Sequence, residues 1–239
     1  MVANKNIVLT LALTLICFLA SGNSIRRIST FEGLSNNSVF SLHQDHLGHL
    51  WIGTTDGLNI WDGHSLEMFN PDDGKNFFAG NTILGIQPDG KDGIWLRTYY
   101  GIAYINTTTR EIIYYDSLTF ASYMACGTDG VPYVIGSDRF IYHLDKKSDS
   151  FIKSEVKIPN SKEYLKQMHR YGSDSLYCFT NKGIYLIKDL TLKKKIDTDI
   201  AFVSANPEQP SAVKKEGQYY RGCCNKKTYG NIVIYELGS

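Results

Sequence analysis

The most constraining feature of this chain is a pattern that recurs after 44 residues. Residues 45–58, DHLGHLWIGTTDGL, are echoed without a gap by residues 89–102, DGKDGIWLRTYYGI. Three identities anchor the alignment: Trp51 with Trp95, Thr54 with Thr98, and Gly57 with Gly101. Such a period marks a repeat protein whose single unit cannot bury its apolar face alone. Each copy reads as a short strand, a turn with Gly and a second short strand, which is typical of four-stranded propeller blades of about 40–45 residues.

Weaker copies extend the repeat toward the C-terminus. Residues 175–184, SLYCFTNKGI, align with residues 93–102 and carry Tyr177 at the position of the tryptophan. A third copy at 130–145 has an altered turn, and residues 217–235 suggest a fifth. We therefore predict an all-β fold, a β-propeller of about five four-stranded blades. Their predicted bounds are roughly 38–69, 82–115, 120–156, 164–196 and 200–235.

The fifth predicted blade is one strand short. Its strand patterns lie at 200–203, 219–220 and 232–235, with an irregular stretch over 206–217. Another short strand pattern lies at 28–31, before blade one begins. Propellers commonly close by pairing a strand from one terminus into a blade built by the other, which leaves only protected edges. Either this N-terminal strand completes blade five, or blades are missing and an open edge remains.

Residues 1–22 have the features of a secretory signal peptide. Lys5 supplies a positive charge, residues 7–20 form an apolar run of 14 residues, and small residues occupy 20–22. The run is too short for a comfortable membrane span of about 20 residues. We expect export to the periplasm, leaving residues 23–239 as a propeller that makes no membrane contact.

The charge balance argues against an electrostatic partner. Lys and Arg together number 25 and Asp and Glu 24, and the predicted leader contains Lys5 but no acid. A mature chain without net charge lacks the basic footprint of a nucleic-acid-binding protein. The four remaining cysteines, Cys126, Cys178, Cys223 and Cys224, are too few for a disulfide scaffold, and the sequence leaves their pairing open.

The repeat distinguishes residues that recur at equivalent positions, which are expected to be structural, from residues that occur in one blade only. Aromatic residues at equivalent positions, Trp51, Trp95, Tyr133 and Tyr177, are expected to pack between blades. Residues that do not repeat are better candidates for a ligand site. The segment Arg97-Thr98-Tyr99-Tyr100 replaces small residues of blade one, and predicts a hairpin tip suited to stacking on sugar rings and pairing with acidic groups. The alternative is a tip that docks on the neighbouring blade. At this exposed tip, Arg97→Ala is expected to cost little stability.

Three further ligand-binding candidates, Tyr123, Arg139 and His169, lie near predicted inner strands, where they would line the channel. We expect neither a metal nor a cofactor. His43, His46 and His49 are spaced by three, but they straddle a strand, a turn and a strand, so polar turn positions explain them better than a zinc site.

Catalytic motifs are not visible, and we predict that the chain is not an enzyme. Propeller glycosidases, however, take their carboxylates from separate blades, which a local motif does not reveal. An exported glycoside hydrolase or lyase therefore stays as an alternative, beside a protein-interaction scaffold.

The runs FEGLSNNSV at 31–39 and LWIGTTDGLNIWDG at 50–63 resemble the two-component regulator propeller family. The resemblance is close over 31–63, recognisable over 89–105 and thin beyond Tyr133. It implies the N-terminal portion of a periplasmic sensor from the hybrid two-component systems with which gut Bacteroidetes detect polysaccharide fragments. An oligosaccharide is then the implied ligand, and the rest of a sensor kinase or a second copy is the implied partner.

The kinase and output regions of such systems are not recognisable in this sequence. No second apolar span follows residue 22, and no Gly-rich ATP-binding stretch is present. The expectation is therefore a truncated or fragmentary sensor that binds ligand and does not signal alone.

Overall fold

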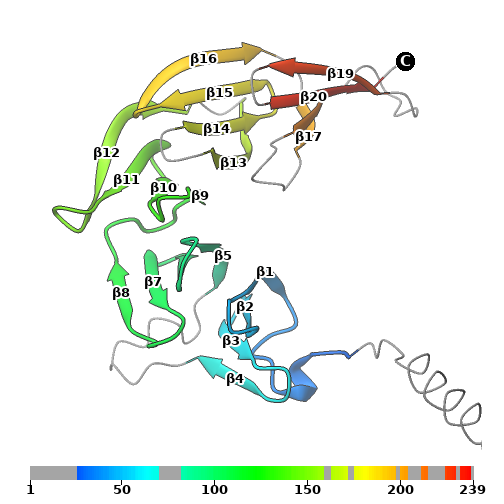
Figure 1. Ribbon diagram of the computed structural model, residues 1–239, viewed down its shortest axis with the longest axis vertical. Coiled ribbons are helices and arrows are strands. Elements are labelled where there is room, and N and C mark those ends of the chain that lie inside the picture. The colour runs from blue at the N-terminus through cyan, green and yellow to red at the C-terminus, as the bar shows by residue number, and fades with distance from the viewer. Residues whose placement is uncertain are drawn as a thin grey trace, which may run out of the picture.

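The computed structural model is an arc of five four-stranded β-sheets that follow one another along the chain (Figure 1). The structure describes residues 26–69, 82–158, 163–171, 175–197, 200–203, 211–214, 224–229 and 232–237. Over these residues it has strands β1 to β20 and one short 3-10 helix, η1 (Thr30–Glu32). None of the described segments forms an apolar helix of membrane-spanning length. The predicted all-β propeller class is confirmed, and no closed ring is detected among these residues. The leader predicted at 1–22 lies outside them.

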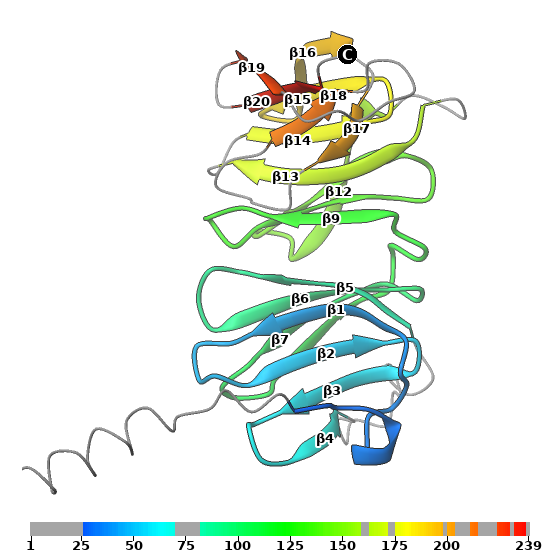
Figure 2. The same cartoon turned by 90° about the vertical axis from the view of Figure 1, so that its right-hand side faces the viewer.

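The strands group into blades in chain order (Figure 2). Blade one comprises β1 (Val39–Gln44), β2 (Leu50–Thr54), β3 (Gly57–Trp61) and β4 (Leu66–Phe69). Blade two comprises β5 (Ile83–Pro88), β6 (Gly93–Thr98), β7 (Ile102–Asn106) and β8 (Ile112–Tyr115). Blade three comprises β9 (Tyr123–Cys126), β10 (Pro132–Ile135), β11 (Phe140–Asp145) and β12 (Ser150–Lys157). Blade four comprises β13 (Leu165–Tyr171), β14 (Ser175–Thr180), β15 (Gly183–Lys188) and β16 (Thr191–Asp197).

The fifth sheet departs from the blade pattern. It contains β17 (Ile200–Val203), β18 (Ser211–Lys214), β19 (Cys224–Tyr229) and β20 (Ile232–Leu237), in the order β17-β18-β20-β19. The first four sheets are antiparallel meanders, whereas β18 pairs with β20 in parallel. The prediction of an irregular stretch over 206–217 is wrong where β18 forms, and the strand predicted at 219–220 lies outside the described residues.

Of the two alternatives for blade five, the one with a closing strand at 28–31 does not form, because local hydrogen bonds fold part of this segment into η1. The Ser29 hydroxyl accepts from the Phe31 N–H, and the Glu32 carboxylate accepts from the Ser29 N–H at 2.7 Å. Gly33, with φ at 103°, ends the turn in the left-handed region. The chain then runs against blade one, where the Ser35 N–H donates to Asn59 Oδ1 at 3.0 Å. The fifth sheet takes its fourth strand from its own part of the chain.

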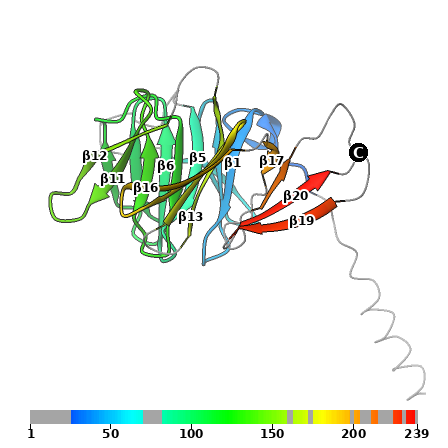
Figure 3. The same cartoon turned by 90° about the horizontal axis from the view of Figure 1, so that it is seen from above.

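Inner strands face the concave side of the arc. β1, β5, β9 and β13 lie on that side, whereas β4, β8, β12 and β16 lie outside (Figure 1). Seen from above, the fifth sheet stands on the side toward which the arc opens, opposite β11 and β12 (Figure 3). Neighbouring inner strands contact one another from β1 through β5 and β9 to β13. Side chains from four blades therefore meet on one concave surface.

The repeated Thr-x-x-Gly sequence makes the same turn in blades one, two and four. The hydroxyls of Thr54, Thr98 and Thr180 donate to the carbonyls of the glycines three residues on, at 3.1, 3.0 and 3.1 Å. Each hydroxyl also accepts a main-chain N–H two residues on. At Gly101, with φ at 149°, a Cβ would meet the Tyr115 carbonyl, so the turn requires glycine. This turn is local, which explains why it is visible in the sequence.

Packing between blades follows the 44-residue equivalence. Trp51 and Trp95 are buried at matching positions in β2 and β6, as predicted, and Tyr177 is buried in β14. One core cluster joins blade one to blade two, with Trp51, Ile60 and Phe69 against Ile86 and Leu96.

The other face of blade one is covered only in part: Ile52, which pairs with Leu42, is 3% exposed, and Asn59 beside it is bound by Ser35. Leu42 lies 44 residues before Ile86, yet it is 57% exposed whereas Ile86 is 6% exposed. Met68, on the same face, is also exposed. Equivalent residues therefore have opposite environments, because blade one covers blade two and no described blade covers blade one.

Candidate functional site

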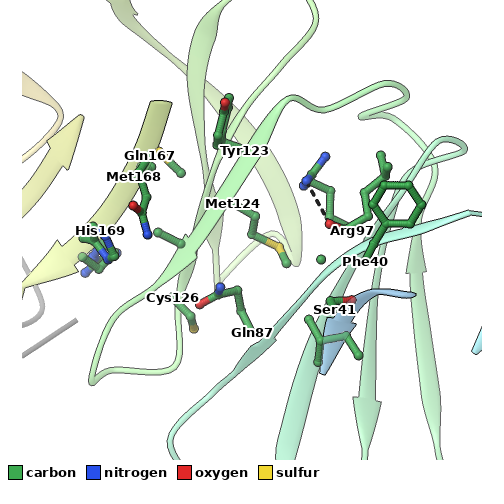
Figure 4. Close-up of a pocket in the computed structure, with 15 residues that line it drawn as sticks. Phe40, Ser41, Gln87, Arg97, Tyr123, Met124, Cys126, Gln167, Met168 and His169 are labelled. Atoms are coloured by element: carbon green, nitrogen blue, oxygen red, sulfur yellow. Dashed lines mark hydrogen bonds between the residues drawn. The ribbon is translucent and has the colours of Figure 1, made fainter. Parts of the chain in front are cut away.

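A cavity of about 410 Å³ lies on the concave side of the arc (Figure 4). β1, β5, β6, β9 and β13 all contribute to its lining. Phe40 and Ser41 come from blade one, Gln87 and Arg97 from blade two, Tyr123 and Cys126 from blade three, and Gln167 and His169 from blade four. Inner strands of a propeller converge on its axis, so residues far apart in the sequence share this wall.

Arg97 lies in this cavity, not at an exposed tip as predicted. Its β6 position pairs with Gly85 of β5, where an added Cβ would lie 3.7 Å from Arg97 Nε, an ordinary contact distance. Nη1 donates to the carbonyl of Ala121 at 2.9 Å. Nη2 donates to that of Leu84 at 3.1 Å, the dashed line at Arg97 in Figure 4. Burial lowers the pKa of Arg97, but a guanidinium stays protonated in proteins. A half-buried positive charge therefore faces the cavity.

Tyr99 and Tyr100 are separated from Arg97 by the turn. Both are exposed at the β6–β7 hairpin, outside the cavity lining. The Tyr99 ring lies 5.9 Å from that of Phe120. The predicted cluster of one arginine and two tyrosines is therefore divided between the cavity and the rim.

Tyr123 and His169 line the cavity, from β9 and β13. The Tyr123 hydroxyl donates to the Leu165 carbonyl at 2.7 Å and so joins blade three to blade four. Burial raises the pKa of Tyr123, opposed by the nearby charge of Arg97. His169 is buried and packs edge-on against Phe179, with ring centroids 6.0 Å apart.

Arg139 lies in a separate groove of about 370 Å³, beside Tyr123 and Tyr164. Its Nε donates to the Ile158 carbonyl at 3.2 Å, and its Nη2 donates to the Glu163 carbonyl at 2.9 Å. The structure thus brings Arg97, Tyr123 and His169 together and places Arg139 in the adjoining groove.

Two arginines, Arg97 and Arg170, lie in the described lining of the cavity, and none of its residues is Asp or Glu. Arg170 is compensated, because its Nη2 lies 3.2 Å from Asp129 Oδ2 and its guanidinium covers the Tyr133 ring at 4.0 Å. The described residues offer Arg97 only carbonyl oxygens as hydrogen-bond acceptors.

Several lining residues were missed from the sequence, among them Phe40, Gln87 and Gln167. For two of the strands, β1 and β5, the repeat could have predicted these lining positions. Residues 40–43 of β1 and 84–87 of β5 are 44 residues apart, and both segments contribute to the lining. Applying the 44-residue repeat to the inner strands, and not only to the repeated turn, would have identified this wall.

Metal and thiol chemistry find little support here. No group of three His, Cys, Asp or Glu among the described residues is arranged to hold a metal ion. His46 and His49 instead lie near Asp92 and Asp45, at 3.7 and 3.4 Å. Cys126 and Cys178 are both unpaired in the described part of the chain, and burial raises the pKa of the Cys126 thiol to about 12. Such a thiol is a poor nucleophile at neutral pH.

Comparison with known proteins identifies one repeat. Residues 33–56 match the family model of the two component regulator propeller, which confirms the resemblance over this segment. A curated relative, Histidine kinase P4 of Formosa agariphila, is 44% identical over 50 residues. That alignment covers 20% of this chain and 4% of the relative.

Solved structures with the same fold include two from B. thetaiotaomicron. One, described as the extracellular domain of a one component system, has a TM-score of 0.56 at 22% identity, over 76% of this chain and 27% of that chain. Another, described as the extracellular domain of a hybrid two component system, has a TM-score of 0.57 at 21% identity. The match covers 75% of this chain and 27% of that chain. Virginiamycin B lyase from Staphylococcus aureus is also similar, with a TM-score of 0.51 at 12% identity. The match covers 68% of this chain and 56% of the lyase chain. The likeness shows the propeller fold in sensors and in an enzyme, and this chain spans about a quarter of the length of the two extracellular domains.

Proposed function

We propose that this chain, which carries a two component regulator propeller repeat at residues 33–56, is a ligand-sensing segment of a periplasmic two-component sensor. We further propose that it recognises acidic oligosaccharides in the concave cavity. The observation that carries the ligand class is the guanidinium of Arg97, which faces the cavity and hydrogen-bonds only carbonyl oxygens of the described residues.

A half-buried charge without a counter-ion attracts an anion. Removing a cation from water costs free energy unless an opposite charge compensates it. Two carbonyl dipoles supply part of that compensation at Arg97, and no carboxylate of the described lining supplies the rest. A carboxylate or sulfate group on a ligand would provide it, through charge-assisted hydrogen bonds to the guanidinium.

Other lining residues suit a sugar. Phe40 is 56% exposed at the cavity and offers an apolar ring face to a pyranose. Gln87 and Gln167 supply amide donors and acceptors for hydroxyl groups. A mostly preformed pocket with a few directional polar groups is the usual form of a small-molecule site.

The site also suits a sensor, because its walls belong to four blades. A ligand that contacts several blades binds more tightly to one relative arrangement of them, and so shifts the population toward it. The partner that reads this shift is proposed to be the remainder of a sensor kinase or a second copy of the chain.

The same cavity gives less support to the alternative that the chain is a glycoside hydrolase. Glycoside hydrolysis generally needs two carboxyl groups flanking the scissile bond, and no described lining residue carries one. The lyase of similar fold shares 12% identity with this chain, and a shared fold does not imply a shared reaction.

Calorimetric titration with oligogalacturonates, compared with neutral galacto-oligosaccharides of equal length, tests the proposal. We expect binding of the acidic series alone, weakened by salt because the attraction is ionic. Phe40→Ala should weaken it about tenfold, whereas Phe31→Ala should leave it unchanged, since Phe31 is 96% exposed outside the cavity.

Two results would overturn the proposal. Equal affinity for neutral and acidic sugars would remove the role of Arg97. Turnover of any oligosaccharide, followed by chromatography of the mixture, would make the chain an enzyme.

A further inference from the structure

The turn between β6 and β7 carries two tyrosines that the turn itself does not require. Tyr99 and Tyr100 lie where blade one has Thr55-Asp56 and blade four has Asn181-Lys182. All three turns are closed by the same threonine hydroxyl bonds, so polar residues are sufficient there. Tyr99 and Tyr100 are nevertheless 44% and 60% exposed. Their rings therefore add apolar surface to the rim that the turn does not need.

The main chain at Tyr99 has the same role as its equivalent in blade one. The Thr55 carbonyl accepts from the Thr82 hydroxyl at 3.0 Å, and the Tyr99 carbonyl accepts from the Phe120 N–H at 2.9 Å. In both cases a turn residue binds the segment that enters the next blade. Threonine meets this requirement in blade one, so the aromatic side chain of Tyr99 has no part in it.

Phe120 places a second exposed ring beside Tyr99. It is 61% exposed, and the two ring centroids lie 5.9 Å apart at an interplanar angle of 44°. Its φ of 54° lies in the left-handed region, which is unfavourable for a bulky side chain. The Phe120 ring is thus neither buried by the described residues nor favoured by its backbone. An exposed apolar cluster of this kind is typical of an interaction site.

The ring pair lies next to Arg97. Ala121, which follows Phe120, accepts a hydrogen bond from Arg97 Nη1 at 2.9 Å. Burial lowers the pKa of Arg97, and the phenol groups of Tyr123 and Tyr99 oppose this shift. Such opposition requires a short distance between the groups. The Tyr99 ring therefore lies outside the lining of the cavity but within electrostatic reach of the guanidinium inside it.

The area of the ring pair limits what can bind there. A large aromatic side chain buries about 150–250 Å², so rings exposed at 44% and 61% offer on the order of 200 Å². A stable protein–protein interface buries about 800 Å² on each partner. The pair is therefore small for a protein and suits a sugar unit, whose C–H face contacts the rings while its hydroxyl groups reach the phenol of Tyr99.

We infer that Tyr99 and Phe120 form a stacking subsite for the sugar unit next to the acidic unit bound by Arg97. The inference rests on the proposed function and makes it more specific. The ligand is then an oligosaccharide of at least two units. Its acidic group lies in the cavity, and the apolar face of an adjacent unit lies on the ring pair.

A structural role for the two rings is the competing explanation, because both lie at the junction of blades two and three. Conservative variants separate the two roles. Tyr99→Phe and Phe120→Tyr keep a ring at each position, whereas Tyr99→Leu and Phe120→Leu keep an apolar side chain without a ring. Phe31→Leu is the matched control, because Phe31 is a 96% exposed ring in η1, outside the cavity lining.

The experiment is calorimetric titration of the full chain with galacturonic acid and with two disaccharides that link it to neutral galactose, one in each order. All three probes carry one carboxylate, so a gain in affinity of a disaccharide is not ionic. We expect at least one disaccharide to bind about tenfold more tightly than galacturonic acid. Each leucine variant of the ring pair should remove most of this gain and leave the affinity for galacturonic acid unchanged. The ring-keeping variants and Phe31→Leu should retain the gain.

The outcomes distinguish the two proposals. If galacturonic acid binds and Phe40→Ala weakens it, but neither disaccharide binds more tightly, the stacking subsite is wrong and the proposed function stands. The subsite is also wrong if the gain survives both leucine variants of the pair. A change in the sedimentation of Tyr99→Leu, with the gain intact, would make the pair a protein contact.

If no acidic sugar binds at all, the proposed function fails together with the subsite. Loss of the gain in Tyr99→Phe and Phe120→Tyr would contradict stacking, because these variants keep both rings. Circular dichroism and thermal unfolding of each variant show whether a lost gain reflects a lost fold.

Discussion

Arg97 Nη1 donates a 2.9 Å hydrogen bond to the main-chain carbonyl of Ala121, and this contact joins the second strand of blade two to the segment that enters blade three. Because Nη2 also holds the Leu84 carbonyl, the guanidinium clamps both sides of the junction. One residue therefore combines an inter-blade contact with the charge of the proposed site.

Arg97→Ala should consequently lower the free energy of unfolding by about 2 kcal/mol, because hydrogen bonds from a charged group are worth about 1.5–3 kcal/mol. This reverses the small effect expected from the sequence. Arg110→Ala, which removes an exposed ion pair with Glu67, should cost under about 1 kcal/mol. Urea denaturation followed by tryptophan fluorescence measures both, and equal effects would contradict the clamp.

Leu42 and Ile86 occupy equivalent inner-strand positions with opposite exposure. Ile86→Ala should cost about 2–5 kcal/mol, since a buried aliphatic residue loses both transfer free energy and packing. Leu42→Ala should cost less than about 1 kcal/mol in the isolated chain. Thermal unfolding of the two variants tests this pair, and a large loss at Leu42 would mean that another surface covers blade one in solution.

Trp51 and Trp95 share a repeat position but not a hydrogen-bond partner. The Trp51 indole donates to the buried carboxylate of Asp45 in its own blade at 2.8 Å. The Trp95 indole donates to the Gly130 carbonyl of blade three at 3.1 Å. Asp89, the repeat equivalent of Asp45, instead accepts a hydrogen bond from the Tyr104 hydroxyl at 2.9 Å.

Trp51→Phe should therefore cost about 2–3 kcal/mol and Trp95→Phe about 1 kcal/mol, because loss of a donor to a buried charge is the more costly. Truncation to alanine should cost about 3–5 kcal/mol at either site. Chemical denaturation of the four variants gives the comparison. A larger loss for Trp95→Phe than for Trp51→Phe would reverse the assigned roles of the two indoles.

Because of Asp45, the free energy of unfolding should depend on pH in the acidic range. Burial alone would raise the pKa of its carboxyl, but hydrogen bonds from the Trp51 indole and the His49 main chain outweigh burial and hold the pKa below its ordinary value. Stability from a lowered carboxyl pKa is fully present above the unfolded value of about 3.9 and is lost as the pH falls toward the folded value.

The unaltered chain should therefore exceed Asp45→Asn in stability at pH 7, and the difference should shrink below about pH 4. Denaturation curves of both proteins across this range give the difference directly. A gap between them that stays constant with pH would show that the carboxylate charge contributes nothing.

The sequence by itself determined the repeat, because the interactions that define it are local. Thr54 reaches Gly57 three residues away, and Asp45 binds the N–H groups of Leu47 and His49 in its own turn. Such short-range bonds recur with the same residue types in the blades that make this turn, and the 44-residue echo of blades one and two therefore predicted the class of fold. Burial of Trp51 and Trp95 followed from the same periodicity.

Only the tertiary structure decided where the non-repeated residues go. Arg97 lies in the cavity, where its guanidinium donates to the carbonyl of Leu84 and to that of Ala121 in the segment that enters the next blade. The parallel pairing of β18 with β20 is likewise a long-range choice that no local pattern encodes. The cavity itself depends on five strands from four blades brought together by blade stacking. Its residues are distant in the chain, so their common wall exists only once the apolar faces between blades are buried.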